Sequence, residues 1–283
     1  INTRLGKDHG PYLYHLDIVN CPTRAMTGHN FSGNNFDWKH APKEYGAIHF
    51  HDDDVDDARW DVDFEWNVPE GTSSKFYAAK LTTDDGDEEY VTFWVVPEVG
   101  KEQSKIAFMV PTISYMAYAN EHLANNAGGA ELLVYRVPIM QDQNMFLSEH
   151  REYGGSIYDT HTDGSGLCLS SRLRPILSIR PKYDHFLMQA PWQYPADLHL
   201  IYWLEEMGYE YDCIMDEDTN YDGLARLENY NVVITGSHPE HNSGPQLDAL
   251  HNYTQQGGRL MYMGADAWYW IHSYHPAYED LGR

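Results

Sequence analysis

Two histidines and a glutamate lie close together in the segment 237–243, which reads SHPEHNS. The apolar run 232–235 precedes this segment, and a helix-forming run follows it. In open α/β sheets, such strand-to-helix connections carry ligands and catalytic groups. His238, Glu240 and His241 are therefore candidates for a metal site, because imidazole and carboxylate groups are common metal ligands.

A serine nucleophile is the alternative chemistry for the same segment. Ser237 stands directly after the end of an apolar run, where a nucleophile elbow would place it. The second glycine of the elbow pattern is missing, and Pro239 removes a backbone donor that such a turn could use. The pattern therefore favours a metal site over a serine hydrolase.

Two further segments combine histidines with carboxylates. The acidic run 49–60, HFHDDDVDDARW, suggests a hard cation such as calcium, but it lacks the spacing of an EF-hand, and a solvated acidic loop is the alternative. In the segment 158–166, YDTHTDGSG, an extended backbone would place Asp159, His161 and Asp163 on one side. The alternative there is a turn formed by the Asp-Gly and Ser-Gly pairs.

The elements that would position these residues alternate in type between residues 101 and 264. The predicted strands are 105–112, 211–216, 231–236 and 259–264, and the predicted helices are 196–208, 221–230 and 244–258. This alternation predicts an α/β fold with an open, mostly parallel sheet and helices on both faces. The polar stretch between the first strand and the first helix would be an insertion at the sheet edge.

The first hundred residues have a different character. Strand-type residues fill short runs at 45–51 and 90–97. The segment 61–81 alternates, breaks at a Pro-Glu-Gly turn and resumes, which predicts a strand, a turn and a strand as in a β-sandwich. This part of the chain is therefore expected to be all-β.

Ligands of an open parallel sheet collect beyond the carboxyl ends of its strands. The stretches expected there are 111–120, 190–197, 215–220, 235–242 and 263–270. They are rich in tyrosine and include Tyr115, Tyr118, Tyr194 and Tyr269. A phenol with a pKa of about 10 normally stays neutral, but a trivalent metal would bind it as a phenolate. Aromatic packing is the alternative role for these tyrosines.

The bulk composition excludes some partner classes. The net charge of −24, with no basic cluster, argues against binding to nucleic acid. No apolar stretch approaches the length of about 20 residues that a membrane span needs. Three cysteines without a CxxC pair indicate a reducing compartment, so a cytoplasmic location is expected.

Several long segments carry a resemblance to a known family. They read CPTRAMTGHN, YGAIHFHDDDVDDARWDVDF, YDTHTDGSGLCLSSRLRPILSIRPKY, PWQYPADLHLIYWLE, YDCIMDEDTNYDGLARLENYNVVITGSHPE and YTQQGGRLMYMGADAWYW. These segments resemble the N,N-dimethylformamidase large (beta) subunit family over nearly the whole chain. Because members of that family are longer, the resemblance implies that this chain covers a middle portion.

The resemblance implies a division into three parts. Residues 1–60 would be the end of a lectin-like β region, 61–100 an immunoglobulin-like β region, and 101–283 a glutaminase-like α/β catalytic domain that is incomplete at its C-terminus.

The resemblance also implies an activity: hydrolysis of a small formamide to formate and an amine by iron-activated water. The cofactor would be one ferric ion (Fe3+), held by two tyrosines and one glutamate. The enzyme would be an oligomer with a small partner subunit.

Applied to this chain, the resemblance implies specific site residues. The family pattern His-Pro-Glu-Tyr ends in an expected iron ligand, and His241 stands at the place of that tyrosine. Tyr194 is the expected second ligand, and the glutamate ligand is expected beyond Arg283. His238 and Glu240 are the expected catalytic groups. Asp266 replaces an expected asparagine.

Two alternatives to an iron amidohydrolase remain at this stage. An inactive paralogue acting as a binding or assembly subunit is the first, and His241 favours it. The second is a metal-free hydrolase that uses Ser237.

Overall fold

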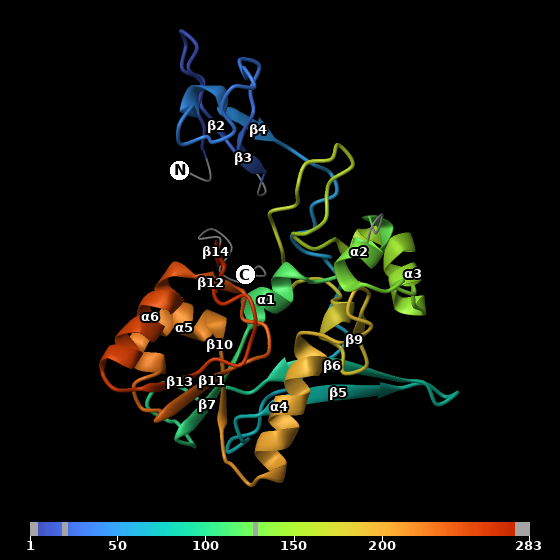
Figure 1. The fold of residues 1–283 in the computed structure, drawn as a ribbon, viewed down its shortest axis with the longest axis vertical. Helices are drawn as coiled ribbons and strands as arrows, with labels where there is room; N and C mark the ends of the chain where they lie inside the picture. The colour runs from blue at the N-terminus through green and yellow to red at the C-terminus, as the bar shows by residue number, and fades with distance from the viewer. Residues whose placement is uncertain (1–4, 19–21, 127–129, 275–283) are drawn as a thin grey trace.

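The computed structural model describes residues 5–18, 22–126 and 130–274. Its centre is a four-stranded sheet whose neighbouring strands are all parallel (Figure 1). The strands are β7 (Ile106–Val110), β10 (Asp212–Met215), β11 (Val232–Thr235) and β13 (Arg259–Met261). Their order across the sheet is β10-β7-β11-β13. All four were predicted from the sequence, and the mostly parallel sheet is confirmed.

Strand β7 lies inside the sheet and packs on both of its faces. Phe108 and Val110 join the core cluster under α4 (Tyr194–Glu206), whereas Met109 joins the cluster under α6 (Gly244–Gln255). Successive side chains of a strand point to opposite faces, so a run of apolar residues fills two cores at once. Helices therefore cover both faces of the sheet, as the alternation of elements predicted.

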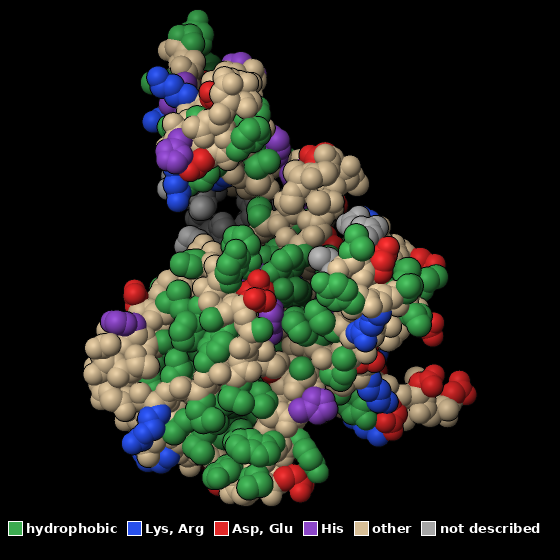
Figure 2. All heavy atoms as spheres, viewed as in Figure 1, with side chains coloured by type: hydrophobic (Ala, Val, Ile, Leu, Met, Phe, Trp, Pro, Cys, Tyr) green, Lys and Arg blue, Asp and Glu red, His purple; other side chains and the backbone are tan. Residues whose placement is uncertain are grey.

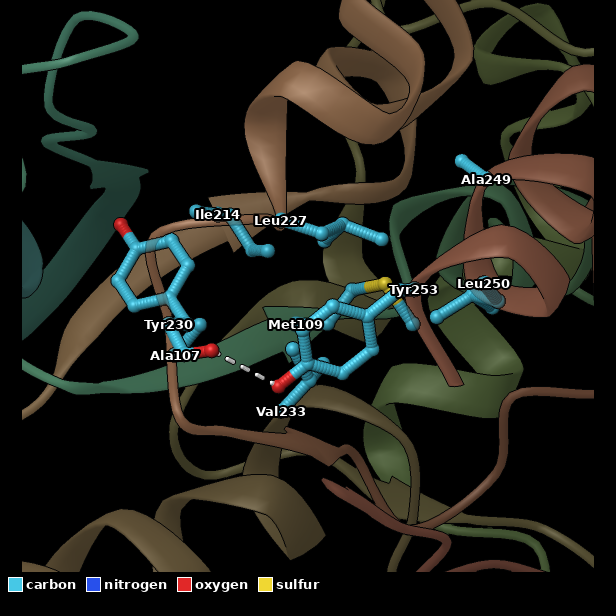
Figure 3. Packing of buried hydrophobic residues seen from close by; sticks show 9 residues of the cluster. All are labelled: Ala107, Met109, Ile214, Leu227, Tyr230, Val233, Ala249, Leu250 and Tyr253. Atoms are coloured by element: carbon cyan, nitrogen blue, oxygen red, sulfur yellow. Dashed lines mark hydrogen bonds between the residues drawn. The ribbon is translucent and has the colours of Figure 1, made fainter. Parts of the chain in front are cut away.

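The core under α6 is closed by a tyrosine. Figure 3 shows Tyr253 of α6 among the side chains of β7 and β11, with its hydroxyl donating a hydrogen bond to the carbonyl of Tyr230 at 3.1 Å. This bond satisfies the one polar atom that the ring carries into the core. Each large side chain buried in this way contributes about 1.5–3 kcal/mol relative to an exposed one.

Helix α5 (Asp216–Asp222) begins directly after β10, earlier than the predicted helix 221–230. Its first turn is acidic, and the Asp218 carboxylate accepts a hydrogen bond from the Met215 amide at 2.8 Å. Acidic groups stabilise a helix N-terminus, but they give no apolar periodicity in the sequence. The start of this helix was therefore predicted wrongly.

In the described residues of the N-terminal third, the strands form small antiparallel pairs. These strands are β1 (Leu5–Gly6), β2 (Leu16–Asp17), β3 (Thr23–Met26), β4 (Ala47–His49), β5 (Phe76–Thr82) and β6 (Glu88–Trp94). Strands β5 and β6 form a hairpin that turns at residues 83–87, and its acidic tip projects from the body (Figures 1 and 2). The strand predicted within 61–68 is wrong: this stretch forms no strand, and its side chains are exposed. The lectin-like and immunoglobulin-like regions stay predictions.

The remaining elements are short and lie outside the central sheet. The helices are α1 (Thr112–Ala117), α2 (Ala130–Val134) and α3 (Asp142–Glu149), and the strands are β8 (Asp184–His185), β9 (Ala190–Pro191), β12 (His241–Ser243) and β14 (Trp270–His272). The 3-10 helices are η1 (Pro42–Glu44), η2 (Leu123–Asn126), η3 (Arg151–Tyr153), η4 (Leu177–Ile179) and η5 (Gly223–Arg226). Among the described helices, none has the length and apolar character that a membrane crossing requires.

Candidate metal centre

The strand order creates a switch point between β7 and β11. From β7 the chain passes to β10 on one side and then returns to β11 on the other side. Helix α1 follows β7 directly, and residues 236–240 follow β11. Connections that leave a sheet in opposite directions open a crevice at the carboxyl ends of the strands, where ligands bind.

Glu240 is the centre of a buried cluster in this crevice and is only 6% exposed. The Tyr118 hydroxyl donates to Oε2 of Glu240 at 2.6 Å, and the Tyr158 hydroxyl donates to Oε1 at 3.0 Å. Nε2 of His238 lies 3.0 Å from Oε2. The two tyrosine rings stack with centroids 4.4 Å apart, so both phenols reach one carboxylate side by side.

Two histidines extend the cluster behind Tyr158. Nε2 of His241 lies 2.9 Å from the Tyr158 hydroxyl, and Nδ1 lies 2.6 Å from Nε2 of His272. Parallel pairing of β12 with β14 places the two histidines close together. If Tyr158 donates to Glu240, His241 must donate to Tyr158 from Nε2 and accept from His272 at Nδ1.

The environment fixes the charge of each group. Burial raises the pKa of Tyr118 far above its usual range, and the hydrogen bond to Glu240 adds to this rise. Burial also raises the pKa of Tyr158. For Glu240, burial opposes ionisation, but the bond from Tyr118 and the nearby His241 outweigh it and lower the pKa. Burial lowers the pKa of His241 to about 4. At neutral pH the cluster therefore holds two neutral phenols, a carboxylate and a neutral imidazole at position 241.

A buried aspartate holds the start of the loop that carries Glu240. Oδ1 of Asp197 accepts a hydrogen bond from the Ser237 amide at 2.5 Å, and its other oxygen accepts from the Tyr115 hydroxyl. A Cβ at Gly236 would lie 2.3 Å from the Asp197 carboxylate and 2.6 Å from Pro111. Only glycine allows β11 and α4 to approach this closely, so Gly236 and Asp197 together define the path of the loop.

Aromatic side chains form one wall of the cluster. The Trp192 ring lies 4.5 Å from the ring of His238, and the Tyr118 ring lies 5.8 Å from it. Nδ1 of His238 is buried without a hydrogen-bond partner among the described residues. His238 is therefore held at Nε2 and flanked by aromatic rings, while its second nitrogen has no protein partner among the described residues.

The structure brings together three of the four site residues singled out in the sequence. His238, Glu240 and His241 all belong to the cluster. Tyr194 does not, because its ring packs 6.0 Å from the rings of Phe76 and Trp94 in the core under α4. Tyr194 is the first residue of α4, and its side chain points into the core between this helix and the sheet rather than into the crevice.

The sequence indicated the two tyrosines that contact Glu240 less clearly than it indicated the other residues of the cluster. Tyr118 was one of several tyrosines expected near the strand ends. Tyr158 was missed as a site residue, although its segment 158–166 stood out for its histidine and aspartates. No periodic element connects that segment to the sheet, so no local pattern indicates that it returns to the crevice.

Other predicted rim groups lie elsewhere or at the margin. Asp216 is fully buried and accepts hydrogen bonds from the Ile113 amide and the Gln246 side chain. Asp266 has a carboxylate oxygen within 4.8 Å of ligand atoms of His238 and Glu240, so it can contribute to this centre.

A cavity of about 930 Å³ lies beside the β5–β6 hairpin, and no residue of the Glu240 cluster lines it.

Residues 23–283 match the family described as "N,N-dimethylformamidase beta subunit-like, C-terminal". The chain belongs to this family. It is 42% identical over 264 residues to the N,N-dimethylformamidase beta subunit of Paracoccus aminophilus, and 41% identical over 264 residues to that of Alcaligenes sp. Each match covers 93% of this chain but 34% of the relative. The chain thus spans about a third of the length of these members of the family.

Family membership agrees with the resemblance seen in the sequence. The matched region includes every residue of the Glu240 cluster, because it runs from residue 23 to residue 283. The cluster is thus part of the shared region.

Proposed function

We propose that this chain forms the metal-binding part of an iron-dependent amidohydrolase that cleaves small formamides such as N,N-dimethylformamide. One observation carries the proposal: two phenols converge on the two oxygens of one buried carboxylate at the switch point of the sheet. The names of the relatives support amide hydrolysis as the reaction class.

The donor set fits a ferric ion. Two phenolates and one carboxylate carry three negative charges, which a trivalent cation balances within a buried site. A divalent ion would leave a net buried charge, and unpaired buried charge is costly. Because burial keeps Tyr118 and Tyr158 protonated without a cation, binding of Fe3+ would release their protons.

This proposal revises the ligands inferred from the resemblance. Tyr118, Tyr158 and Glu240 replace Tyr194, His241 and a glutamate beyond Arg283. The site then needs no ligand from residues after the described part of the chain. The histidine at position 241 also ceases to be an obstacle to iron binding, because its Nε2 contacts two proposed ligands, Tyr158 at 2.9 Å and Glu240 at 3.3 Å, and has no need to bind the metal itself.

The bound ion would supply Lewis acidity that polarises the formyl oxygen and makes water more acidic. His238 is held at Nε2 by Glu240 and has no protein partner at Nδ1 in the described part of the chain. We assign to His238 the uptake of a proton from the attacking water and its transfer to the leaving amine nitrogen, which returns the imidazole to its neutral form. Glu240, expected from the sequence as a catalytic group, acts in this proposal as a ligand. His241 and His272 orient Tyr158, and Trp192 limits the access of water to His238.

A comparison of three tyrosine variants tests this assignment. We expect Tyr118→Phe and Tyr158→Phe each to lose most of the phenolate-to-iron absorption in the visible range and most of the bound iron. Tyr194→Phe is the matched control and keeps both, because its ring lies in the core. Loss of the absorption only in Tyr194→Phe would overturn the ligand set.

Formamide hydrolysis is tested separately on the iron-loaded protein with its copurifying subunits. We expect formate release from N,N-dimethylformamide, and its loss after chelation. The name "beta subunit" of the relatives leads us to propose a smaller partner subunit as well. An inactive but iron-loaded protein would favour the paralogue acting as an assembly subunit. Activity that survives chelation would favour the hydrolase that uses Ser237.

A further inference from the structure

A second histidine cluster lies between two segments that are far apart in sequence. The chain that follows β4 runs beside the loop 158–166 (Figure 1), and the rings of His51 and His161 stack there with centroids 3.6 Å apart. The side chain of His161 is 0% exposed and that of His51 is 7% exposed. Two imidazoles are therefore buried face to face in a segment with no sheet beneath it.

Each imidazole is held at one nitrogen by an oxygen acceptor. Nδ1 of His161 lies 2.6 Å from Oδ1 of Asp53. Nε2 of His51 lies 3.0 Å from the Ser165 hydroxyl and 3.2 Å from the Asp163 carboxylate. If these nitrogens carry the protons, the second nitrogen of each ring has a free lone pair.

Both of those second nitrogens are buried and unpartnered. Nε2 of His161 and Nδ1 of His51 have no hydrogen bond within the part of the chain that the structure describes. A buried polar atom without a partner costs about 1–3 kcal/mol. Two such atoms on stacked rings point to a ligand that accepts both lone pairs.

A carboxylate completes the group. Oδ1 of Asp54 lies 3.7 Å from Nε2 of His161, beyond hydrogen-bond distance. Ligand atoms of His51, Asp54 and His161 all lie within 4.8 Å of one another. Donor atoms around one zinc ion, each about 2.0–2.2 Å from it, are separated by comparable distances.

We propose that His51, Asp54 and His161 bind a divalent transition-metal ion of the zinc class. Two imidazole nitrogens with one carboxylate select such an ion over calcium or magnesium, which prefer all-oxygen sites. Asp53 accepts the proton of His161 Nδ1, and carboxylates in this position commonly orient metal-binding histidines. The two rings are parallel to within 1°, so binding of one ion by both lone pairs would require the rings to rotate out of the stack.

This site is separate from the Glu240 cluster in its residues and in its donor chemistry. It contains no phenol, and its ion links residues 51–54 to a loop position 108 residues further along the chain. The ion would also offset repulsion within the acidic run of residues 52–57. Its role is therefore to fix the loop, whatever reaction the crevice performs.

Cobalt(II) serves as the probe, because its visible absorption reports nitrogen and oxygen ligands. The full chain, with any copurifying subunit, is stripped of metal and titrated with Co2+. We expect one band that persists in Glu240→Gln and disappears or weakens at least tenfold in His161→Gln and in Asp54→Asn. Asp53→Asn should weaken binding by about 10–100-fold. His199→Ala, which removes an exposed histidine of α4, is the matched control and leaves the band unchanged.

Circular dichroism without metal shows whether each variant folds. If His161→Gln does not fold, the half-buried Asp54→Asn carries the test. Equal cobalt binding by the wild type and Asp54→Asn would overturn the proposal. So would loss of the band only in His49→Ala, which would place the ion at the neighbouring group of His49, His51 and Asp163. Calcium binding with equal affinity would contradict the assignment to a transition metal.

Discussion

The Glu240 cluster and the His51–His161 cluster use similar side chains on different scaffolds. The first lies where β7 and β11 end, and Asp197 and Gly236 fix the loop that carries Glu240. The second joins two irregular segments through the hydrogen bonds of His161 with Asp53 and of His51 with Ser165. A parallel sheet positions donor atoms before any ion binds, whereas two loops need the ion to hold them. The two sites should therefore respond differently to mutation.

The largest expected effect comes from Glu240→Gln. The change removes the charge that Tyr118, Tyr158 and His238 all contact. We expect kcat/KM for formamide hydrolysis to fall by more than about 100-fold. Loss of a group that only hydrogen-bonds to a metal ligand already costs about 10–100-fold, and Glu240 is itself a proposed ligand. Glu98→Gln on the surface is the control. A loss below tenfold would show that Glu240 is not central to the site.

Next in size is the effect of Gly236→Ala on stability. The added methyl group meets the Asp197 carboxylate and Pro111, so the loop or α4 must move. We expect the free energy of unfolding to fall by about 1–3 kcal/mol in denaturant titrations. Gly46→Ala is the matched control, because no atom lies within 4 Å of the Cβ that this change would add. Equal stability of the two variants would mean that the sheet does not hold the loop rigidly.

Per pH unit, a smaller effect is expected from the buried carboxyl of Asp216. Burial raises its pKa to about 8 in the folded protein. Between about pH 4 and this value the folded state keeps a proton that the unfolded state has lost, so stability falls as the pH rises. Asp216→Asn should flatten this slope by up to about 1.4 kcal/mol per pH unit, the limit for one proton. An unchanged slope in thermal or denaturant unfolding across this range would contradict burial of a protonated carboxyl.

The smallest effect is expected from Asp163→Asn in the loop cluster. The Asp163 side chain is 53% exposed, and its contact with His51 is one of several that hold that ring. Exposed ion pairs contribute little at ordinary salt. We expect no measurable shift of the thermal midpoint at neutral pH. A large shift would mean that the loop cluster depends on this surface pair more than on Asp54.

The sequence predicted the sheet and part of the site because local signals encode them. The apolar runs of β7 and β11 identified the strands, and the position of Glu240 after a strand end placed it in the crevice. Tyr158 could not be placed, since its segment returns to the sheet through an insertion without periodicity. Tyr194 was predicted to line the crevice because it stands just before a helix on that side of the sheet. Its place in the sequence does not show in which direction its ring points.

The loop cluster shows the same limit more strongly. His51 and Asp163 stand 112 residues apart, and each belongs to a polar run that also fits a solvated turn. Only the folded chain reveals that the two runs meet. The calcium site weighed for residues 49–60 needed oxygen donors alone, whereas the fold adds His161 to the group.

The segment 158–166 begins at Tyr158 in the crevice and continues through His161 into the loop cluster. Polar turns such as its Asp-Gly-Ser tip normally accept tags or extra residues. Here the number of residues between Tyr158 and His161 determines whether both side chains can make their contacts at the same time. One residue inserted between 158 and 161 would displace the phenol or the imidazole, so this exposed turn is a poor place for a label.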